Sequence, residues 1–191
     1  MMGNWKGIVG LNFNAIEFDH YCHSLHWTQW RPSFIVLHNT SSPTLDQRPH
    51  GFTHQHMENL EDYYKNKMHW SAGPHLFIDD KQIWVFCPLN LSGVHSPSYN
   101  KFAFGIEMLG DYNIEEFNSG RGLLVQQNTI AAMTSLSAVL GLDPKNMKLH
   151  KEDPITKHKD CPGKHVVKEQ IISAVTKLLQ QRHPGEHLFP G

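Results

Sequence analysis

Phe34-Ile-Val-Leu-His38 is a run of four apolar residues that ends on a histidine. A continuous apolar run of this length is typical of a central strand that is buried on both faces. The run Phe102-Ala-Phe-Gly-Ile-Glu-Met-Leu109 predicts a second strand of the same kind. Because helical patterns alternate with such strands, the sequence predicts an α/β fold, a single domain with a central mixed β-sheet flanked by helices.

Hydrophobic spacing and turn residues place the other elements. The elements expected are a short helix within residues 14–27, a helix from the Thr53 cap to residue 66, a β-hairpin over 75–79 and 82–86, a helix over 122–140, a strand end at 148–150 and a helix over 162–181. The inward face of the last helix is expected to carry Val167, Ile171, Val175 and Leu178. The chain then divides into an N-terminal extension with a short helix (1–29), a main domain (30–182) and a flexible tail (183–191).

Composition limits the class of protein. The 191 residues are 39% hydrophobic and 18% charged, as in an ordinary globular domain. A formal net charge of -1, with no run of Lys or Arg, argues against nucleic acid as a partner. No apolar stretch approaches the length of a membrane span, and the N-terminus lacks the pattern of a signal peptide, which predicts synthesis in the cytoplasm. Three cysteines imply no disulfide framework.

Two histidines and one cysteine suggest a metal site. His38 and His150 each follow apolar strand residues, and the ends of buried strands line the crevice where α/β proteins usually bind ligands. Cys161 precedes Pro162-Gly163, where we expect a helix to start, and a helix N-terminus favours the thiolate. Two imidazoles and a thiolate give three ligands for Zn²⁺ with a fourth position open for water. The alternatives are packing histidines with a free thiol, or Cys161 as a papain-type nucleophile that lacks a paired base.

Five segments, taken together, resemble one family. The chain is similar to the zinc-dependent N-acetylmuramoyl-L-alanine amidases of type 2, a superfamily that includes phage amidase-type lysozymes and animal peptidoglycan recognition proteins. The segments that carry the resemblance are residues 36–43 (VLHNTSSP), 70–79 (WSAGPHLFID), 93–96 (GVHS), 105–110 (GIEMLG) and 150–163 (HKEDPITKHKDCPG).

The resemblance implies a zinc site formed by His38, His150 and Cys161. Asp160 competes for the third position because some relatives use a carboxylate there, although alignment on the Pro-Gly favours Cys161. The interval from His150 to Cys161 is longer than in the small phage enzymes, which leaves His158 as an outside candidate ligand.

The resemblance also implies roles for residues around the metal. Glu107 matches the acidic residue that many bacterial relatives place beside the metal, and it is expected to act as general base. Lys159 matches a basic residue aimed at the reacting carbonyl, where it would stabilise an oxyanion. Pro74 stands where many relatives have a tyrosine, so the general acid stays open. Residues expected to contact substrate are His95, His75, Asn39 and Trp70.

The implied activity is hydrolysis of the amide between the lactyl group of N-acetylmuramic acid and L-alanine in peptidoglycan, with Zn²⁺ as cofactor. Three biological roles share this chemistry: a phage or prophage endolysin, a cytoplasmic muropeptide-recycling amidase, and an exported antibacterial effector. The first would act on the wall, in the periplasm, after release from the cytoplasm. A non-catalytic peptidoglycan-binding module is the competing class. We expect a monomer.

Overall fold

Six strands form one mixed sheet in the order β1-β4-β3-β5-β2-β6. The structure is a computed structural model, which describes residues 4–182 of the chain. The strands are β1 (Leu11–Phe13), β2 (Phe34–Asn39), β3 (Leu76–Ile78), β4 (Ile83–Val85), β5 (Ala103–Met108) and β6 (Lys148–Leu149). Pairs β1–β4 and β4–β3 are antiparallel, whereas β3, β5, β2 and β6 run parallel. The predicted central mixed sheet is confirmed.

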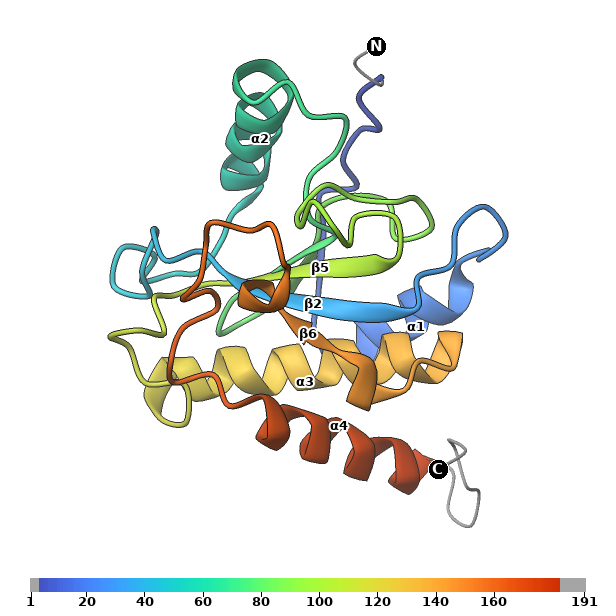
Figure 1. Ribbon diagram of the computed structural model, residues 1–191, viewed down its shortest axis with the longest axis vertical. Helices are drawn as coiled ribbons and strands as arrows, with labels where there is room; N and C mark the ends of the chain where they lie inside the picture. Colours follow the sequence, from blue (N-terminus) through green and yellow to red (C-terminus); the bar gives the residue numbers. More distant parts are fainter. Residues whose placement is uncertain (1–3, 183–191) are drawn as a thin grey trace.

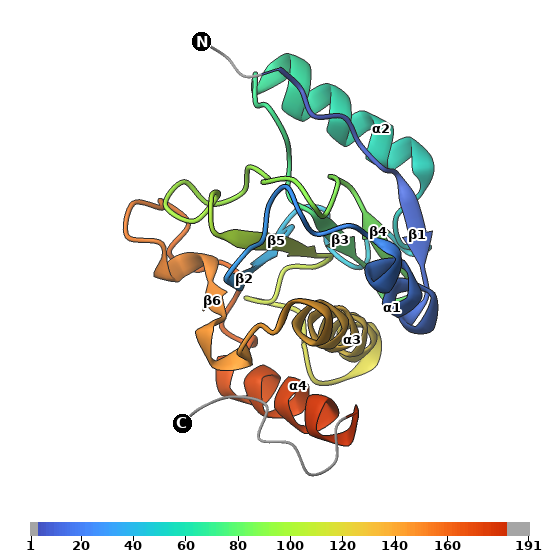
Figure 2. The same ribbon diagram turned by 90° about the vertical axis from the view of Figure 1, so that its right-hand side faces the viewer.

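Within residues 4–182, four α-helices lie on the two sides of this sheet (Figures 1 and 2). Their bounds are α1 (Ala15–Ser24), α2 (His54–Asp62), α3 (Gly120–Leu140) and α4 (Lys168–Arg182). In both views α3 runs beneath the sheet with α1 beside it, α4 lies below α3, and α2 stands on the opposite side. Thr53 caps α2 as predicted, because its side chain accepts a hydrogen bond from the backbone N–H of His56. Gly141 ends α3 with a φ of 68°, a conformation that glycine adopts without strain.

The register of the three neighbouring parallel strands places polar side chains side by side. His38 on β2 lies opposite Glu107 on β5. Leu37 lies opposite Leu149 on β6, so His150, the next residue, continues beside His38. Since parallel strands present their carboxyl ends at the same edge, these side chains meet at one place on the α2 side of the sheet.

Helix α3 is the apolar centre of the helical layer. Its length and composition alone would allow it to cross a membrane, so the expectation that no apolar stretch approaches that length was wrong. In this fold it packs against α1, α4 and strands β3, β4 and β5. Met133 and Leu136 are buried in the core. Its apolar character is therefore that of a core helix between a sheet and two other helices.

The N-terminal extension is part of the sheet layer. β1, which the sequence did not predict, pairs with β4 as the edge strand. α1 is capped by Asn14 and buries Phe18 and Cys22, while Ile16 stays exposed. Lys6 anchors the segment before β1 through a hydrogen bond to the carbonyl of Ser92. Residues 4–24 thus widen the sheet and its helical layer.

The last predicted helix is present, but its predicted start at residue 162 was wrong. α4 begins at Lys168 and buries Ile171, Val175 and Leu179, whereas Val167 and Leu178 are partly exposed. The preceding turns are held away from helical geometry because Gly163 has a φ of 110° and the N–H of His165 donates to the carbonyl of Tyr112. The predicted tail, 183–191, lies outside the described residues.

Candidate metal centre

His38, His150 and Cys161 form a cluster whose ligand atoms all lie within 4.8 Å of one another. His38 lies near the carboxyl end of β2, and His150 follows β6. On a tetrahedral Zn²⁺, with bonds of about 2.0–2.3 Å, neighbouring ligand atoms stand about 3.5 Å apart. Two imidazole nitrogens and one thiolate sulfur are a donor set that zinc prefers. The residues present therefore fit zinc, provided that their ligand atoms move slightly closer together when the ion binds.

The loop from His150 to Cys161 folds back on itself and so returns the cysteine to the histidine. The N–H of Lys151 donates to the carbonyl of Cys161 at 2.9 Å, which closes the loop. Inside it, Asp153 accepts hydrogen bonds from Ser96 and Ser98, so the loop is also tied to the segment beside β5. This is why residues eleven positions apart share one site.

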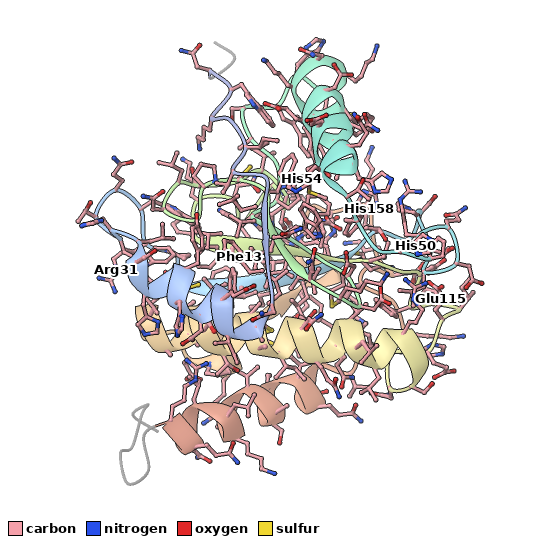
Figure 3. The ribbon with its side chains drawn as sticks, turned by 180° about the vertical axis from the view of Figure 1, so that it is seen from behind. Phe13, Arg31, His50, His54, Glu115 and His158 are labelled. Atoms are coloured by element: carbon pink, nitrogen blue, oxygen red, sulfur yellow. The ribbon has the colours of Figure 1, made fainter. Side chains whose placement is uncertain are left out.

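Competing ligand candidates lie outside the cluster. Asp160 and His158 line the same cleft, but the metal-ligand cluster contains Cys161 and neither of them. The ring of His158 lies 5.3 Å from that of His150, centroid to centroid. Figure 3 shows His158 on the α2 side of the molecule, away from α3 and α4.

Burial keeps the two imidazoles neutral. It lowers the pKa of His38 well below its usual value, with further contributions from His95, His150 and His158. Burial also lowers the pKa of His150 to about 4, helped by His158. Neutral imidazole is the form that binds a metal, so both rings are ready to do so near neutral pH.

Cys161 is a protonated thiol in this environment. Burial and the nearby Glu107 carboxyl raise its pKa to about 12, against smaller opposing effects of the Asn39 backbone and Lys151. The expectation of a helix N-terminus that favours the thiolate was wrong, because α4 begins seven residues later. A cation at the cluster is therefore what would stabilise the thiolate.

Glu107 stands beside the cluster on β5. Its Oε1 lies 3.8 Å from Nδ1 of His38, and its side chain is 16% exposed. Burial raises the pKa of this carboxyl to about 8. A carboxyl group that is mostly shielded from water and lies next to a candidate metal site is suited to hold or release a proton at this position.

The cluster opens into a cleft of about 610 Å³. The predicted residues that line it are His38, Asn39, Trp70, His95, Glu107, His150, Lys159 and Cys161. Lys159 is exposed on the loop before Cys161. Asn39 is nearly buried, and its side-chain amide donates to the carbonyl of Gly110. Imidazole, carboxyl, ammonium and aromatic groups thus converge on one concave site.

His75, expected to contact substrate, is instead inside the protein. It is 0% exposed and does not line the cleft. Its Nε2 lies 3.0 Å from the carbonyl of Leu91, and its Nδ1 accepts the N–H of Gly105. Its ring also stacks on Trp30 with an interplanar angle of 5°. Gly93 leaves room for this ring, since a Cβ there would lie 2.7 Å from His75 Cε1. These contacts make His75 a framework residue.

A family model described as N-acetylmuramoyl-L-alanine amidase matches residues 28–164, which is well over half of the chain. The chain belongs to this family. The match spans all the cluster residues and Glu107, and it begins after α1. A comparison with curated protein sequences gives no significant match.

Solved structures of similar fold are amidases and peptidoglycan recognition proteins. The N-acetylmuramoyl-L-alanine amidase LysC from Clostridium intestinale is 25% identical, with a TM-score of 0.61 over 80% of this chain and 94% of that one. The Ph2119 endolysin of a Thermus scotoductus bacteriophage is 21% identical, with a TM-score of 0.56 over 78% and 88%. Wild-type Drosophila PGRP-LB is 19% identical, with a TM-score of 0.58 over 76% and 83%. Family and fold together make this chain a peptidoglycan amidase.

The structure of this amidase adds two residues that the sequence did not reveal. Tyr64 lines the cleft and stacks on Trp70, with ring centroids 5.1 Å apart and an interplanar angle of 7°. It lies in a π-helical turn, Tyr63–Lys67, that continues α2. Thr156 is buried, and its hydroxyl is 3.0 Å from Nε2 of His150. Helical spacing places Tyr64 on one face of the predicted helix with Met57 and Leu60, and nothing in the sequence singles out Thr156.

Proposed function

We propose that this amidase is zinc-dependent and cleaves the bond between the lactyl group of N-acetylmuramic acid and L-alanine as a phage or prophage endolysin. The observation that carries the proposal is the cluster of His38, His150 and Cys161 beside Glu107 at the base of the cleft. The endolysin role is supported by the solved endolysins of similar fold. In that role the enzyme acts on the cell wall after release from the cytoplasm.

In the proposed chemistry, zinc, Glu107 and Lys159 each have a separate role. Zinc held by the cluster would polarise the scissile carbonyl and lower the pKa of a bound water. Glu107, through Oε1, takes a proton from the attacking water and passes it to the nitrogen of the departing L-alanine. The ammonium of Lys159 stabilises the negative charge that develops on the carbonyl oxygen.

Tyr64 lines the same cleft and brings a hydroxyl group to it. Burial raises its pKa well above the usual value, with a further contribution from Glu107, so the group stays protonated. We propose that it donates a hydrogen bond to substrate, in a cleft where Pro74 offers no side-chain donor.

Mass spectrometry of digested peptidoglycan tests the cleaved bond. We expect stem peptides with a free L-alanine amino group and intact glycan strands that carry free lactyl carboxylates. A chelator is expected to stop this release, and added Zn²⁺ to restore it. New reducing sugar ends, or cuts inside the stem peptide, would contradict the proposal. Binding to walls without chelator-sensitive cleavage would favour the non-catalytic module.

Substrate preference separates the biological roles. An endolysin is expected to solubilise intact sacculi, measured as turbidity loss, at least as well as it hydrolyses soluble anhydro-muropeptides. A strong preference for the soluble substrate would instead support the recycling amidase. Lysis of neighbouring cells after export from a producing strain would support the effector.

Zinc affinity is expected to rise with pH. The thiol of Cys161 has a pKa of about 12, so zinc must displace one proton from it at neutral pH. The imidazoles release none, because burial has already lowered their pKa values. Glu107, with a pKa of about 8, releases a second proton when the charge of the ion favours its carboxylate.

The affinity of the wild-type chain should therefore rise by between about tenfold and about a hundredfold per pH unit. For Glu107→Gln we expect about tenfold, because only the thiol proton remains. Competition titrations against a chelator of known pH dependence, between pH 6 and pH 8, measure both slopes. A wild-type affinity that is independent of pH would show that the thiol is not a ligand.

A further inference from the structure

The imidazole of His95 connects a metal ligand to the backbone of β5. Its Nε2 lies 3.0 Å from the carbonyl oxygen of Ala103, and its Nδ1 lies 3.1 Å from Nε2 of His38. A carbonyl oxygen only accepts hydrogen bonds, so Nε2 of His95 must carry the hydrogen. In a neutral ring Nδ1 is then an acceptor. The short contact with His38 follows only if His38 donates from Nε2.

This order of donors decides which nitrogen of His38 is available. With the hydrogen on Nε2, the lone pair of His38 is on Nδ1. Nδ1 is the atom that lies 3.8 Å from Oε1 of Glu107, too far for a hydrogen bond, and it faces the site. We infer that His95 is the positioning residue that fixes the tautomer of His38 and directs its Nδ1 to the metal.

Neighbouring residues hold the His95 ring in place. A Cβ at Gly105 would overlap His95 Cγ, so glycine in the middle of β5 provides the space that the imidazole fills. The backbone N–H groups of His95 and Ser96 both donate to Oδ1 of Asn100 at 2.8 Å, which holds the segment in place. His95 itself is 8% exposed. The ring therefore has one position, in which one nitrogen faces His38 and the other faces the carbonyl of Ala103.

His150 has no equivalent constraint. Its Nε2 faces the hydroxyl of Thr156, which both donates and accepts, so this contact is compatible with either tautomer. Thr156 also accepts the N–H of His158 at 3.2 Å. The two histidine ligands thus differ: the hydrogen-bond chain through His95 allows one tautomer of His38, whereas His150 adapts to the ion.

The inference rests on the proposed zinc site, and zinc affinity tests it apart from activity. Loss of an outer hydrogen-bond partner of a metal-binding histidine typically weakens binding about 10- to 100-fold. We expect that loss for His95→Ala. His95→Asn should recover most of the affinity, because its amide oxygen replaces Nδ1 as the acceptor. His75→Ala is the matched control: an equally buried histidine that bonds only backbone groups and should keep the wild-type zinc Kd.

Competition titrations measure the three affinities, and circular dichroism of the metal-free proteins checks folding. Equal zinc Kd values for wild type and His95→Ala, or equal losses for His95→Ala and His75→Ala, would overturn the inference. A wild-type chain without zinc affinity would overturn the proposed function instead. Nitrogen-15 NMR of the histidine rings in the metal-free wild type needs no variant: we expect His38 protonated at Nε2, and protonation at Nδ1 would overturn the inference.

Discussion

A Cys161→Ala variant is expected to lose zinc and hydrolysis together. The substitution removes the only sulfur from the cluster and leaves two neutral imidazoles, which bind a dication less tightly than a site with a charged thiolate. Loss of an outer partner already costs about 10- to 100-fold in affinity, so loss of a ligand should cost more than about 100-fold. Metal analysis after dialysis and the rate of wall solubilisation measure the two losses.

Two further variants test whether the loss of zinc is specific to the thiol at position 161. Cys22→Ala removes a thiol that is buried between α1 and the core, away from the cluster, and should keep full zinc content. Cys161→Asp supplies a carboxylate oxygen at the same position, and we expect it to retain weak zinc binding and a fraction of the activity. A Cys161→Ala protein that holds one zinc per chain and cleaves walls normally would remove the thiolate from the site.

The apolar strand runs made the sheet predictable. Residues 35–37 and the central part of 102–109 are buried, and such strands leave a continuous apolar pattern in the sequence. The edge strand β1 has only three residues and no such pattern, since Leu11 is 49% exposed. The predicted start of the last helix was less accurate than the predicted strands. Pro162-Gly163 suits a helix start by composition, yet contacts with the 112–115 loop delay α4 to Lys168.

The sequence predicted which residues carry the chemistry of the site, but it did not predict the direction in which each side chain points. His38 and His150 follow buried strands, and the register of β5, β2 and β6 explains why these positions meet. His75 has the same chemistry on a neighbouring strand, but its ring turns toward Trp30 and the backbone of Leu91. No local pattern encodes that choice. The position of Tyr64 in the cleft could not be predicted either. The π-helical turn sets the direction of its side chain, and helical spacing does not describe such a turn.

Glu107→Gln is expected to keep zinc and to lose most of its turnover. Glutamine has the size of glutamate but does not accept a proton, so the cluster stays intact while the proposed general base is removed. General acid–base catalysis contributes about 10²- to 10⁴-fold, and kcat should fall by that factor. Assays at saturating zinc with a soluble muropeptide measure kcat, and metal analysis of the same samples confirms loading. Turnover within threefold of wild type would remove the base assignment.

The same variant has an expected effect on the stability of the metal-free protein. Burial raises the pKa of Glu107 from 4.5 to about 8, so the folded chain holds a proton that the unfolded chain releases between these values. The stability that this proton contributes is complete below pH 4.5 and is lost as pH rises through about 8. The glutamine side chain of the variant does not ionise. The free energy of unfolding of Glu107→Gln, relative to wild type, should therefore increase from pH 5 to pH 9.

Denaturant titrations at pH 5 and pH 9 measure this difference for the two metal-free proteins. Lys148→Gln is a suitable control, because this residue is a partly exposed partner of Glu152 outside the cleft. It should show no comparable divergence between the two pH values. Parallel stability profiles for wild type and Glu107→Gln would mean that the carboxyl is not held protonated by burial. Divergent profiles with a large kcat loss would instead show one buried carboxyl that costs stability at high pH and supplies the proton transfer.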